Sequence, residues 1–346
     1  MAGTGVAARY GILIKDAQAL ELAHKVDTVA FDKTGTLTVG QPRLVEFLDV
    51  EADPSGRALT VAASLQSGSE HPLARAVVAL AQERGAIVAA PSSMHAVPGK
   101  GSEGEVDGAS YLIGSLRWMA ELGVSTAGVD ADILRLQAGG ATLSALVERR
   151  SEGLRLRALM AFADAPKPGA REALAGLRQR GVRVVMISGD NRAAAVAMGA
   201  RLGLAAEDVM ADVLPGDKAA QVAALEAGGR HTVAMVGDGV NDAPALAAAD
   251  VGMAMGTGTD VAMHAAGVTL MRGDVALVAG ALEISRRTVA KIRQNLFWAF
   301  AYNVAGIPLA ALGFLSPVVA GAAMALSSVS VMTNALLLKR WRGPGR

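Results

Sequence analysis

Hydrophobic positions are distributed unevenly along this chain, and the densest run lies near its end. Residues 294–338 are 45 consecutive positions without Asp, Glu, Lys or Arg. One membrane-crossing helix takes about 20 apolar residues, so the run is long enough for two helices. A Gly, a Ser and a Pro within residues 313–317 interrupt it and suit a tight turn. The pattern predicts a helical hairpin with spans at 296–314, ending in Phe314, and at 318–338.

Basic residues flank both ends of this apolar run. They are Arg286, Arg287, Lys291 and Arg293 before it and Lys339, Arg340, Arg342 and Arg346 after it. Because positively charged flanks stay on the cytoplasmic side, both ends of the hairpin are expected in the cytoplasm. Trp298 and Trp341 suit anchors at the membrane interface. The alternative is a buried helical pair in a soluble core, but such cores seldom avoid charge over this length.

Upstream of the hairpin, short apolar runs alternate with helix-like segments. Residues 26–31, 182–187 and 232–236 are rich in apolar and β-branched side chains, and each leads directly into a polar sequence that contains glycine. This is the pattern of parallel strands that deliver a site at their carboxyl ends. The first two runs are separated by about 150 residues with glycine-rich turns of their own. The sequence therefore predicts one α/β domain interrupted by an inserted domain.

Composition narrows the range of functions. The chain is 52% apolar and 19% charged, against roughly 25% charged residues in a typical soluble protein, which agrees with a membrane segment. With 33 basic and 32 acidic residues the net charge is +1, so bulk attraction to nucleic acid is excluded as a basis of function. The chain has no cysteine, which excludes disulfides, thiolate metal sites and cysteine nucleophiles.

The residues after the first predicted strand offer a nucleophile. Asp32 is followed by Lys33, Thr34 and a glycine. An aspartate at the end of a strand, beside backbone N–H groups that can cradle a phosphoryl group, can attack phosphorus with its carboxylate. Lys218, in a later loop, supplies a cation for the charge on the transferring group.

The second and third predicted strands also end in polar loops. These loops contain Ser188, Gly189 and Asp190 after the second strand, and Asp238, Asn241 and Asp242 after the third. A hydroxyl and backbone amides can hold phosphoryl oxygens. Carboxylate oxygens suit Mg²⁺, which usually takes one or two protein carboxylates together with substrate phosphate. We therefore expect a phosphoryl site with Mg²⁺ at this edge of the sheet.

Together these motifs resemble those of P-type ATPases. Residues 32–36 (Asp-Lys-Thr-Gly-Thr) match the phosphorylation motif of that family. Residues 188–190 (Ser-Gly-Asp) match its hydroxyl-Gly-Asp motif, with Ser in place of the commoner Thr, and residues 237–242 (Gly-Asp-Gly-Val-Asn-Asp) match its hinge motif. The resemblance covers essentially the whole chain. It implies the cytoplasmic catalytic portion and the last two membrane helices of such a pump.

The resemblance also implies roles for these residues. Asp32 is expected to take the γ-phosphoryl group of ATP, and Ser188 and Lys218 to hold the transferred oxygens. Lys33, Gly189 and Asp190 belong to the same catalytic loops. Mg²⁺ is expected on Asp32, the Thr34 carbonyl and Asp238, with Asp242 and Asn241 orienting its coordination shell.

Two other functions remain open. Soluble phosphatases with the same haloacid-dehalogenase-like core are similar to one another in a second Asp, two residues after the nucleophile, that acts as general acid and base. Here that position is Thr34, so the aspartyl phosphate is expected to persist, which suits an enzyme that couples phosphorylation to a conformational cycle. A non-catalytic remnant of a transporter is the third reading, and the intact strand-end carboxylates argue against it.

The insertion contains two motifs that resemble the nucleotide-binding motifs of heavy-metal P-type ATPases. They are Ser69-Glu70-His71-Pro72 and the glycines Gly99 and Gly101. The resemblance implies that Glu70, His71, Gly99 and Gly101 bind ATP, since glycines admit the nucleotide closely and a His can stack on a base. Taken alone, His71 is equally suited to a place at the start of the helix predicted over 76–82, and the later glycines favour the nucleotide role. Gln66 stands where that branch commonly has Glu.

The hairpin contains polar residues that suit a transported ion. Tyr302, Asn303, Met324 and Ser328 match signatures of Cu⁺-exporting members, and residues 294–338 contain no carboxylate. A thioether with neutral oxygens suits a soft monovalent cation, Cu⁺ or Ag⁺, better than a divalent ion. The alternative is packing, because Met fills gaps and Ser bonds within membrane helices.

The expected architecture is a haloacid-dehalogenase-like Rossmannoid phosphorylation domain, an inserted α+β nucleotide-binding domain and a C-terminal transmembrane hairpin. The expected boundaries are 1–21 (a segment after a missing membrane helix), 22–48 and 156–274 (phosphorylation domain), 49–155 (nucleotide-binding domain), 275–293 (connecting helix), 294–338 (two membrane helices) and 339–346 (cytoplasmic tail). The family's Cys-Pro-Cys helix and actuator domain are absent from the chain. From the hairpin, the chain is expected to be a multi-pass plasma-membrane or bacterial inner-membrane protein. Without the missing segments, it is expected to bind ATP but not to pump alone.

Overall fold

The computed structural model describes residues 2–53, 55–313 and 316–343. The chain divides into two units. The first comprises Met1–Phe31, Glu172–Val184 and Ala219–Arg346, and the second comprises Asp32–Arg171 and Val185–Lys218. Strands β2 (Thr28–Asp32) and β9 (Arg183–Ile187) begin in the first unit and end in the second.

A seven-stranded sheet contains the three strands predicted from the apolar runs. Its order is β1 (Ile12–Ile14), β13 (Val268–Leu270), β12 (Val251–Met255), β11 (Val233–Gly237), β2, β9 and β10 (Val209–Met210). Strand β11 pairs in parallel with β2 and β12, and β1 is antiparallel to β13. Every residue of β2 and β11 is buried, as continuous apolar runs predict for a parallel sheet.

Short helices accompany this sheet. They are α1 (Ala2–Arg9), α2 (Ala17–Ala23), α7 (Ala170–Gln179), α8 (Arg192–Arg201), α9 (Lys218–Glu226), α10 (Ala243–Ala248) and α11 (Asp260–Ala265). Single turns of helix-like backbone form η1 (Lys33–Leu37), η2 (Ala206–Asp208), η3 (Pro215–Asp217) and η4 (Val240–Asp242). The alternation of strands and helices makes this part of the chain α/β.

The second unit contains the insertion, a six-stranded antiparallel sheet. Its order is β3 (Arg43–Asp49), β8 (Gly153–Ala163), β7 (Thr142–Arg150), β6 (Ala109–Ser115), β5 (Gly101–Val106) and β4 (Ser93–Val97). Because β3 pairs with β8, the sheet reaches positions 43 and 163, a few residues outside the expected boundaries at 49 and 155. The two strands that lead into and out of the insertion are thus part of its sheet.

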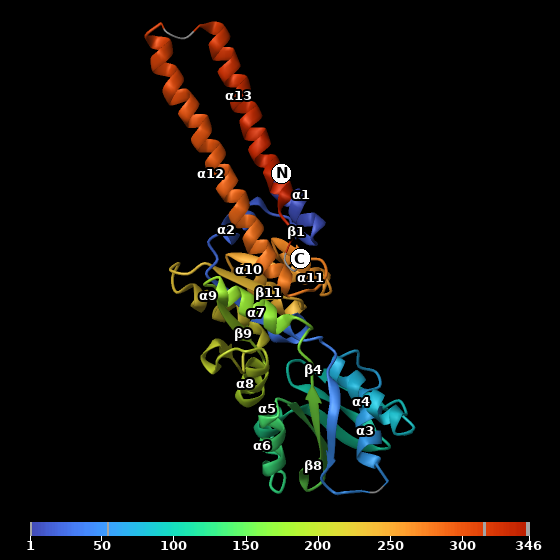
Figure 1. The fold of residues 1–346 in the computed structure, drawn as a ribbon. Helices are drawn as coiled ribbons and strands as arrows, with labels where there is room; N and C mark the ends of the chain where they lie inside the picture. The colour runs from blue at the N-terminus through green and yellow to red at the C-terminus, as the bar shows by residue number, and fades with distance from the viewer. Residues whose placement is uncertain (1, 54, 314–315, 344–346) are drawn as a thin grey trace. The chain divides into compact units, whose positions relative to one another are not determined.

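Helices lie on both faces of the insertion's sheet (Figure 1). Helices α3 (Arg57–Gln66) and α4 (Pro72–Glu83) share one apolar cluster with one face, including Leu65, Val77 and Met160. Helices α5 (Leu116–Glu121) and α6 (Asp130–Ala138) cover the other face, where Leu112 and Leu159 are buried. Leu159 and Met160 are neighbours on β8, so the strand alternates its side chains between two cores.

The C-terminal part of the first unit is a helical hairpin (Figure 1). Helix α12 (Ala276–Ala311) runs unbroken for 36 residues, so the expected connecting helix at 275–293 and the first expected span form one helix. Sequence composition changes near Gln294, but no Pro or Gly lies near this point to end the helix, and Pro308 comes only in its last turns. Helix α13 (Pro317–Leu336) returns alongside α12, and Ser316 caps its start by accepting a hydrogen bond from the Val319 N–H (3.3 Å).

Within the described residues, one helical segment, Val318–Arg340, is long and apolar enough to cross a membrane by length and composition alone. It includes α13 and the turn η5 (Leu337–Arg340). The first expected span stays a prediction, and its end at Phe314 lies outside the described residues, as does Arg346 in the tail. Large apolar side chains on both helices are exposed, among them Phe300 and Val329.

The expectation that Trp341 anchors the chain at a membrane interface is wrong. Its side chain is only 3% exposed. Tyr10 donates a hydrogen bond to the Trp341 carbonyl (3.0 Å), and the two rings meet edge to face with centroids 5.0 Å apart. Trp341 therefore joins the C-terminal end of the chain to α1. Trp298, in contrast, is 53% exposed on α12.

Candidate functional site

Asp32 lies at the carboxyl end of β2 and is buried. Lys218, the first residue of α9, donates a hydrogen bond from Nζ to Asp32 Oδ1 (2.7 Å), and both side chains are nearly inaccessible to solvent. A buried carboxylate requires a charged partner, because removing it from water unpaired costs several kcal/mol. The second unit therefore brings together the predicted nucleophile and the predicted phosphoryl-binding cation.

Lys33 pairs with Asp190 rather than with Asp32. Its Nζ lies 2.5 Å from Asp190 Oδ2, and both side chains are largely buried. The Asp190 N–H donates to Ser188 Oγ (3.1 Å), which closes the loop after β9, and Ser188 is 1% exposed. The backbone after Lys33 turns sharply, with Gly35 at φ 73° and Thr34 exposed beside it. Only glycine adopts this conformation without strain.

Asp238 and Asp242 meet in the loop after β11, within the first unit. Asp242 is 2% exposed, and its Oδ2 accepts hydrogen bonds from the Asp238 N–H (3.2 Å) and the Gly239 N–H (3.0 Å). A Cβ on Gly237 would lie 2.7 Å from the Asp242 Cβ, so glycine is required there. Asp242 thus shapes the loop that presents Asp238, which is partly exposed, while Asn241 is exposed.

The strand register relates these loops to Asp32. Within the first unit, Phe31 on β2 lies level with Val236 on β11 in a parallel pair. Asp32 follows Phe31, and Asp238 comes two residues after Val236. The carboxyl ends of adjacent parallel strands lie at one edge of a sheet, so β2 and β11 end at the same edge, and the expectation that both carboxylates serve one site stays a prediction. Carboxylate oxygens are the donors that Mg²⁺ prefers, so this donor set fits the metal.

The predicted nucleotide residues all lie in the insertion. His71 begins α4, where its Nδ1 accepts the Leu73 N–H (3.2 Å). Partial desolvation of the ring, and then the charge of Arg75, lower the pKa of His71 below its ordinary value. A neutral ring is the form that can accept this bond. The reading of His71 as a helix-start residue is therefore confirmed, and Glu70 beside it is exposed.

The two glycines of the second nucleotide motif differ. A Cβ on Gly101 would lie 2.0 Å from the Ile113 carbonyl oxygen on β6, whereas Gly99, at φ 72°, has open space around it. Gln66 donates a buried hydrogen bond to Ser102 Oγ (2.7 Å), which ties the end of α3 to β5. This bond places the segment that leads to His71 beside the strand that begins with Gly101.

The candidate ion ligands lie on both helices of the hairpin. Asn303 donates to the Ala299 carbonyl (2.8 Å) on α12, and Ser328 donates to the Met324 carbonyl (3.1 Å) on α13. Both bonds stay within one helix. The Met324 side chain is 74% exposed and Tyr302 is 39% exposed. Within the described hairpin, the structure does not bring these four residues together through side-chain bonds.

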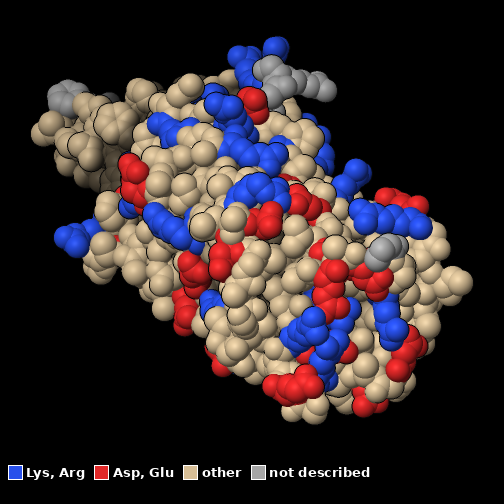
Figure 2. All heavy atoms as spheres, turned by 90° about the horizontal axis from the view of Figure 1, so that it is seen from below, with Lys and Arg blue, Asp and Glu red and all other residues tan. Residues whose placement is uncertain are grey.

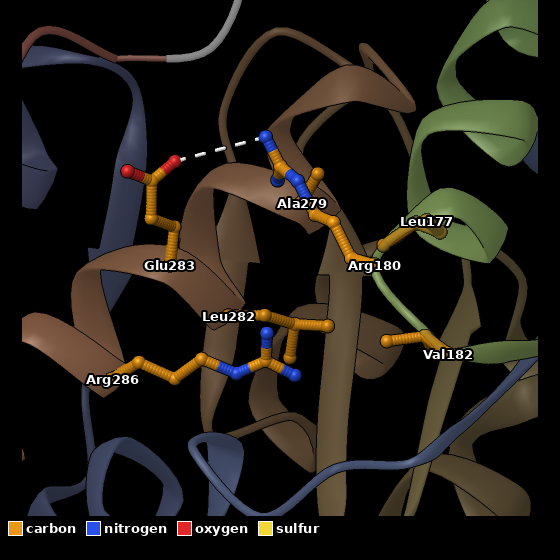
Figure 3. Close-up of a pocket in the computed structure, with 7 residues that line it drawn as sticks. All are labelled: Leu177, Arg180, Val182, Ala279, Leu282, Glu283 and Arg286. Carbon is orange, nitrogen blue, oxygen red and sulfur yellow. Dashed lines mark ion pairs between the residues drawn. The ribbon is translucent and has the colours of Figure 1, made fainter.

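A cavity of about 270 Å³ lies in the first unit, away from the predicted site residues. Its lining comes from the end of α7, the start of β9 and the first turns of α12: Leu177, Arg180, Val182, Ala279, Leu282, Glu283 and Arg286. Figure 3 shows the ion pair across it, in which Arg180 lies 3.8 Å from Glu283. Both arginines are exposed at the surface.

Several charged side chains of the insertion form ion pairs. Arg157 bridges Glu51 (2.9 Å) and Glu148 (2.8 Å), and Arg150 also contacts Glu148. Figure 2 shows Lys and Arg interspersed with Asp and Glu over the face that it draws.

Sequence reasoning missed one contact that bears on the site. Thr142, at the start of β7, donates to Asp190 Oδ1 (3.0 Å), and the sequence indicated there only a glycine-rich turn, at Gly139 and Gly140.

The family model described as haloacid dehalogenase-like hydrolase matches residues 26–250. The chain belongs to this hydrolase family. The segment that matches includes β2, β9 and β11 with the loops that follow them, as well as the insertion. The expected fold class is confirmed, while the domain boundaries and the roles of individual site residues stay predictions.

Relatives of this haloacid dehalogenase-like hydrolase are named as copper-transporting ATPases. It is 48% identical to the probable copper-transporting ATPase PacS of Synechococcus elongatus, over 99% of this chain and 46% of that protein. It is 45% identical to a copper-exporting P-type ATPase of Staphylococcus aureus (strain Newman), over 99% of this chain and 41% of that protein. The chain therefore spans less than half the length of these relatives, and the resemblance to heavy-metal P-type ATPases is confirmed.

Solved structures give the same family. A zinc-transporting PIB-type ATPase in the E2.Pi state is 36% identical with a TM-score of 0.71, and the match covers 98% of this chain and 54% of that one. The catalytic domain of the CPx-ATPase CopB-B, in a structure on conformational changes upon nucleotide binding, is 27% identical with a TM-score of 0.62. That match covers 81% of this chain and 96% of the domain.

Proposed function

We propose that this chain is the catalytic portion of a heavy-metal P-type ATPase that exports Cu⁺ and is phosphorylated by ATP on Asp32. The observation that carries the proposal is the buried pair of Asp32 and Lys218 at the end of a parallel strand. A nucleophilic carboxylate there lies beside a cation that can later neutralise the phosphoryl oxygens.

In the proposed reaction, a carboxylate oxygen of Asp32 attacks the γ-phosphorus of ATP. The bond between that phosphorus and the bridging oxygen breaks, and ADP leaves with its electron pair. Lys218, already bonded to Asp32, neutralises charge on the transferred group, and Ser188 can donate its hydroxyl proton to a phosphoryl oxygen. The product is an aspartyl phosphate.

The donor set fits Mg²⁺, with Asp32, the Thr34 carbonyl and Asp238 as proposed ligands. When bound, Mg²⁺ supplies positive charge that the transferring phosphoryl group requires. Asp242 holds the Asp238 loop through its two backbone hydrogen bonds, so its proposed part is to orient Asp238.

The proposed nucleotide site is the surface of the insertion around Glu70, His71, Gly99 and Gly101. The Gln66–Ser102 bond supports it, because it holds the two motifs to the same end of the insertion. Glu70 and His71 are exposed there, as a nucleotide contact requires. ATP bound at this surface is the phosphoryl donor to Asp32.

The proposed cargo is a soft monovalent cation, Cu⁺ or Ag⁺, taken by Tyr302, Asn303, Met324 and Ser328 in the membrane. The absence of carboxylates from residues 294–338 supports a monovalent ion, and the names of the sequence relatives support copper. In detergent, Met324→Leu should lower the Cu⁺ affinity by at least about tenfold in competition with a chromophoric chelator. Unchanged affinity in that variant would remove Met324 from the site.

The proposal is tested by acid-stable labelling of the purified chain with γ-³²P-ATP. Asp32→Asn keeps the shape of the side chain but removes the nucleophilic carboxylate, so labelling should disappear. Asp27→Asn, which changes a partly exposed acid just before β2, is the matched control and should label normally. Undiminished label in Asp32→Asn would exclude the role of Asp32.

The soluble phosphatase remains the second candidate, because the matched family consists of hydrolases. A phosphatase would release phosphate from small esters rapidly and would hold little label at steady state. Thr34 at the position of the second Asp argues against this, since no general base lies two residues after the nucleophile.

A further inference from the structure

The Thr142 hydroxyl reaches from the insertion to the loop that follows β9. Its Oγ1 donates a hydrogen bond to Asp190 Oδ1 (3.0 Å), across 48 sequence positions. The other oxygen of the same carboxylate pairs with Lys33 Nζ (2.5 Å). Asp190 therefore joins an insertion side chain to the residue next to Asp32, and all of these residues belong to the second unit.

A second contact lies beside this hydrogen bond. The turn between α6 and β7 rests on α8, where a Cβ on Gly140 would lie 3.3 Å from the Ala197 Cβ. Asn191 directly follows Asp190 and caps α8 by accepting the Ala194 N–H (3.0 Å). One corner of the insertion thus touches both the loop and the helix that follows it.

This corner lies close to the two segments, near Gly40 and Asp164, that connect the insertion to the rest of the second unit. Thr142 pairs with Phe162 on β8, two residues before Asp164. Asp164 Oδ2 accepts the Gly40 N–H (3.0 Å) where the chain enters and leaves the insertion. Rotation of the insertion about these segments would change the distance between Thr142 and Asp190.

We propose that Thr142 is a positioning residue. Through its hydrogen bond to Asp190, it couples the orientation of the insertion to the position of the Lys33 side chain. When the insertion is oriented as in this structure, the Thr142 hydroxyl satisfies one carboxylate oxygen, so the other oxygen holds Lys33 beside the nucleophile. When the insertion turns away, Asp190 loses a donor and its carboxylate is free to reorient. Charge-assisted hydrogen bonds are directional and strong enough to couple these two positions. The inference rests on the proposed phosphorylation of Asp32.

Labelling kinetics with γ-³²P-ATP test the proposal on the full chain. Thr142→Val replaces the hydroxyl with a methyl of similar volume, and Thr142→Ser keeps the hydroxyl. At saturating ATP, Thr142→Val should label Asp32 roughly tenfold more slowly, while the ATP concentration for half-maximal rate changes less than about twofold. Thr142→Ser should label at close to the wild-type rate. Equal rates in wild type and Thr142→Val, or equally slow rates in both variants, would overturn the proposal.

A distance measurement separates this inference from the proposed function. Because the chain has no cysteine, spin labels can be placed at Ile87→Cys in the insertion and Ala200→Cys on α8, both at exposed positions. Thr142→Val should broaden the distance distribution between the labels, and Thr142→Ser should not. If the wild type shows no more label than Asp32→Asn, the proposed function fails. The distance measurement does not depend on labelling, so it still tests the role of Thr142. An unchanged distribution in Thr142→Val would then overturn the coupling.

Discussion

The strand-end loops and the nucleotide turns of the insertion hold their predicted residues with different kinds of partner. At the strand ends, the predicted residues bond to one another, as in the pairs of Asp32 with Lys218 and Lys33 with Asp190. In the insertion, His71 bonds to the backbone of its own helix, and Gly101 lies against the carbonyl of a neighbouring strand.

The difference shows how far a structure supports a functional role. A buried pair of opposite charges adds little net stability to the fold, because the cost of desolvating the two charges offsets most of their attraction. Its presence therefore supports a chemical role for Asp32 and Lys218. A helix cap and a close strand contact are structural needs in themselves, so their residues need variants that separate structure from nucleotide binding.

The largest expected effect comes from breaking the buried pair at the strand ends. Lys218→Met leaves Asp32 as a buried charge without its Lys partner, which should lower the free energy of unfolding by about 3–5 kcal/mol. The matched control is Lys100→Met, which removes an ion pair with Glu121 whose side chains are 45% and 49% exposed. That loss should be below about 1 kcal/mol. Urea unfolding followed by circular dichroism measures both values.

The double variant Lys218→Met with Asp32→Asn sharpens this test. It removes both charges, so much of the lost stability should return even though labelling stays absent. A loss in Lys218→Met no larger than that in Lys100→Met would show that the strand-end pair contributes no more than an exposed one.

The second prediction separates the two glycines of the insertion. Gly101→Ala places a methyl group 2.0 Å from the Ile113 carbonyl, so β5 and β6 must move apart, and unfolding should become easier by about 2–3 kcal/mol. Gly99→Ala meets no atom within 4 Å and pays only for its positive φ, about 1 kcal/mol. Thermal unfolding of each variant, with and without ATP, measures stability and nucleotide binding together.

Only Gly99→Ala tests nucleotide binding cleanly, because its fold is expected to remain intact. If Gly99 contacts ATP, this variant should lose most of the thermal stabilisation that ATP gives to the wild type. Retention of the full ATP-dependent shift would remove Gly99 from the nucleotide site.

Local sequence signals were sufficient for the strands and loops that carry the strand-end site. The run at 26–31 became β2, and those at 182–187 and 232–236 became β9 and β11, each within two residues. Continuous apolar runs that end in glycine and acid identify buried parallel strands without further information. The strands and the loops that follow them could therefore be predicted from local pattern alone, while the joint role of their carboxylates stays a prediction.

Contacts between distant segments left no such signal. The Thr142–Asp190 bond joins residues 48 positions apart, and the sequence around Thr142 shows only a turn followed by a strand. The burial of Trp341 against Tyr10 joins the two ends of the chain. The continuity of α12 was also missed, because the composition changes near Gln294 while the helical backbone continues through that point. Each outcome depends on tertiary packing rather than on local pattern.

The smallest expected effect concerns pH and the two roles of His71. Its pKa in the folded chain is lowered, so folding favours the neutral ring. A group whose folded pKa lies below its unfolded value contributes stability above the unfolded pKa and loses it as the pH falls through the folded value. Stability should therefore decrease on acidification below about pH 6.5, where the unfolded ring takes up its proton. Protonation of the ring removes the hydrogen bond from the Leu73 N–H, which is one helix cap, so the loss of stability should be less than about 1 kcal/mol.

His71→Asn is the variant that separates the cap from a nucleotide contact. Asn is a good helix cap that does not titrate in this range, so the variant should match the wild type at pH 7.5 and should lack the part of the loss at pH 5.5 that belongs to His71. Thermal unfolding at the two pH values measures this difference. Asn has no ring to stack on a base, so ATP should raise the melting temperature less than in the wild type if His71 contacts the nucleotide. An ATP-dependent shift equal to that of the wild type would leave His71 with its structural role alone, as the contrast with the strand-end pairs suggests.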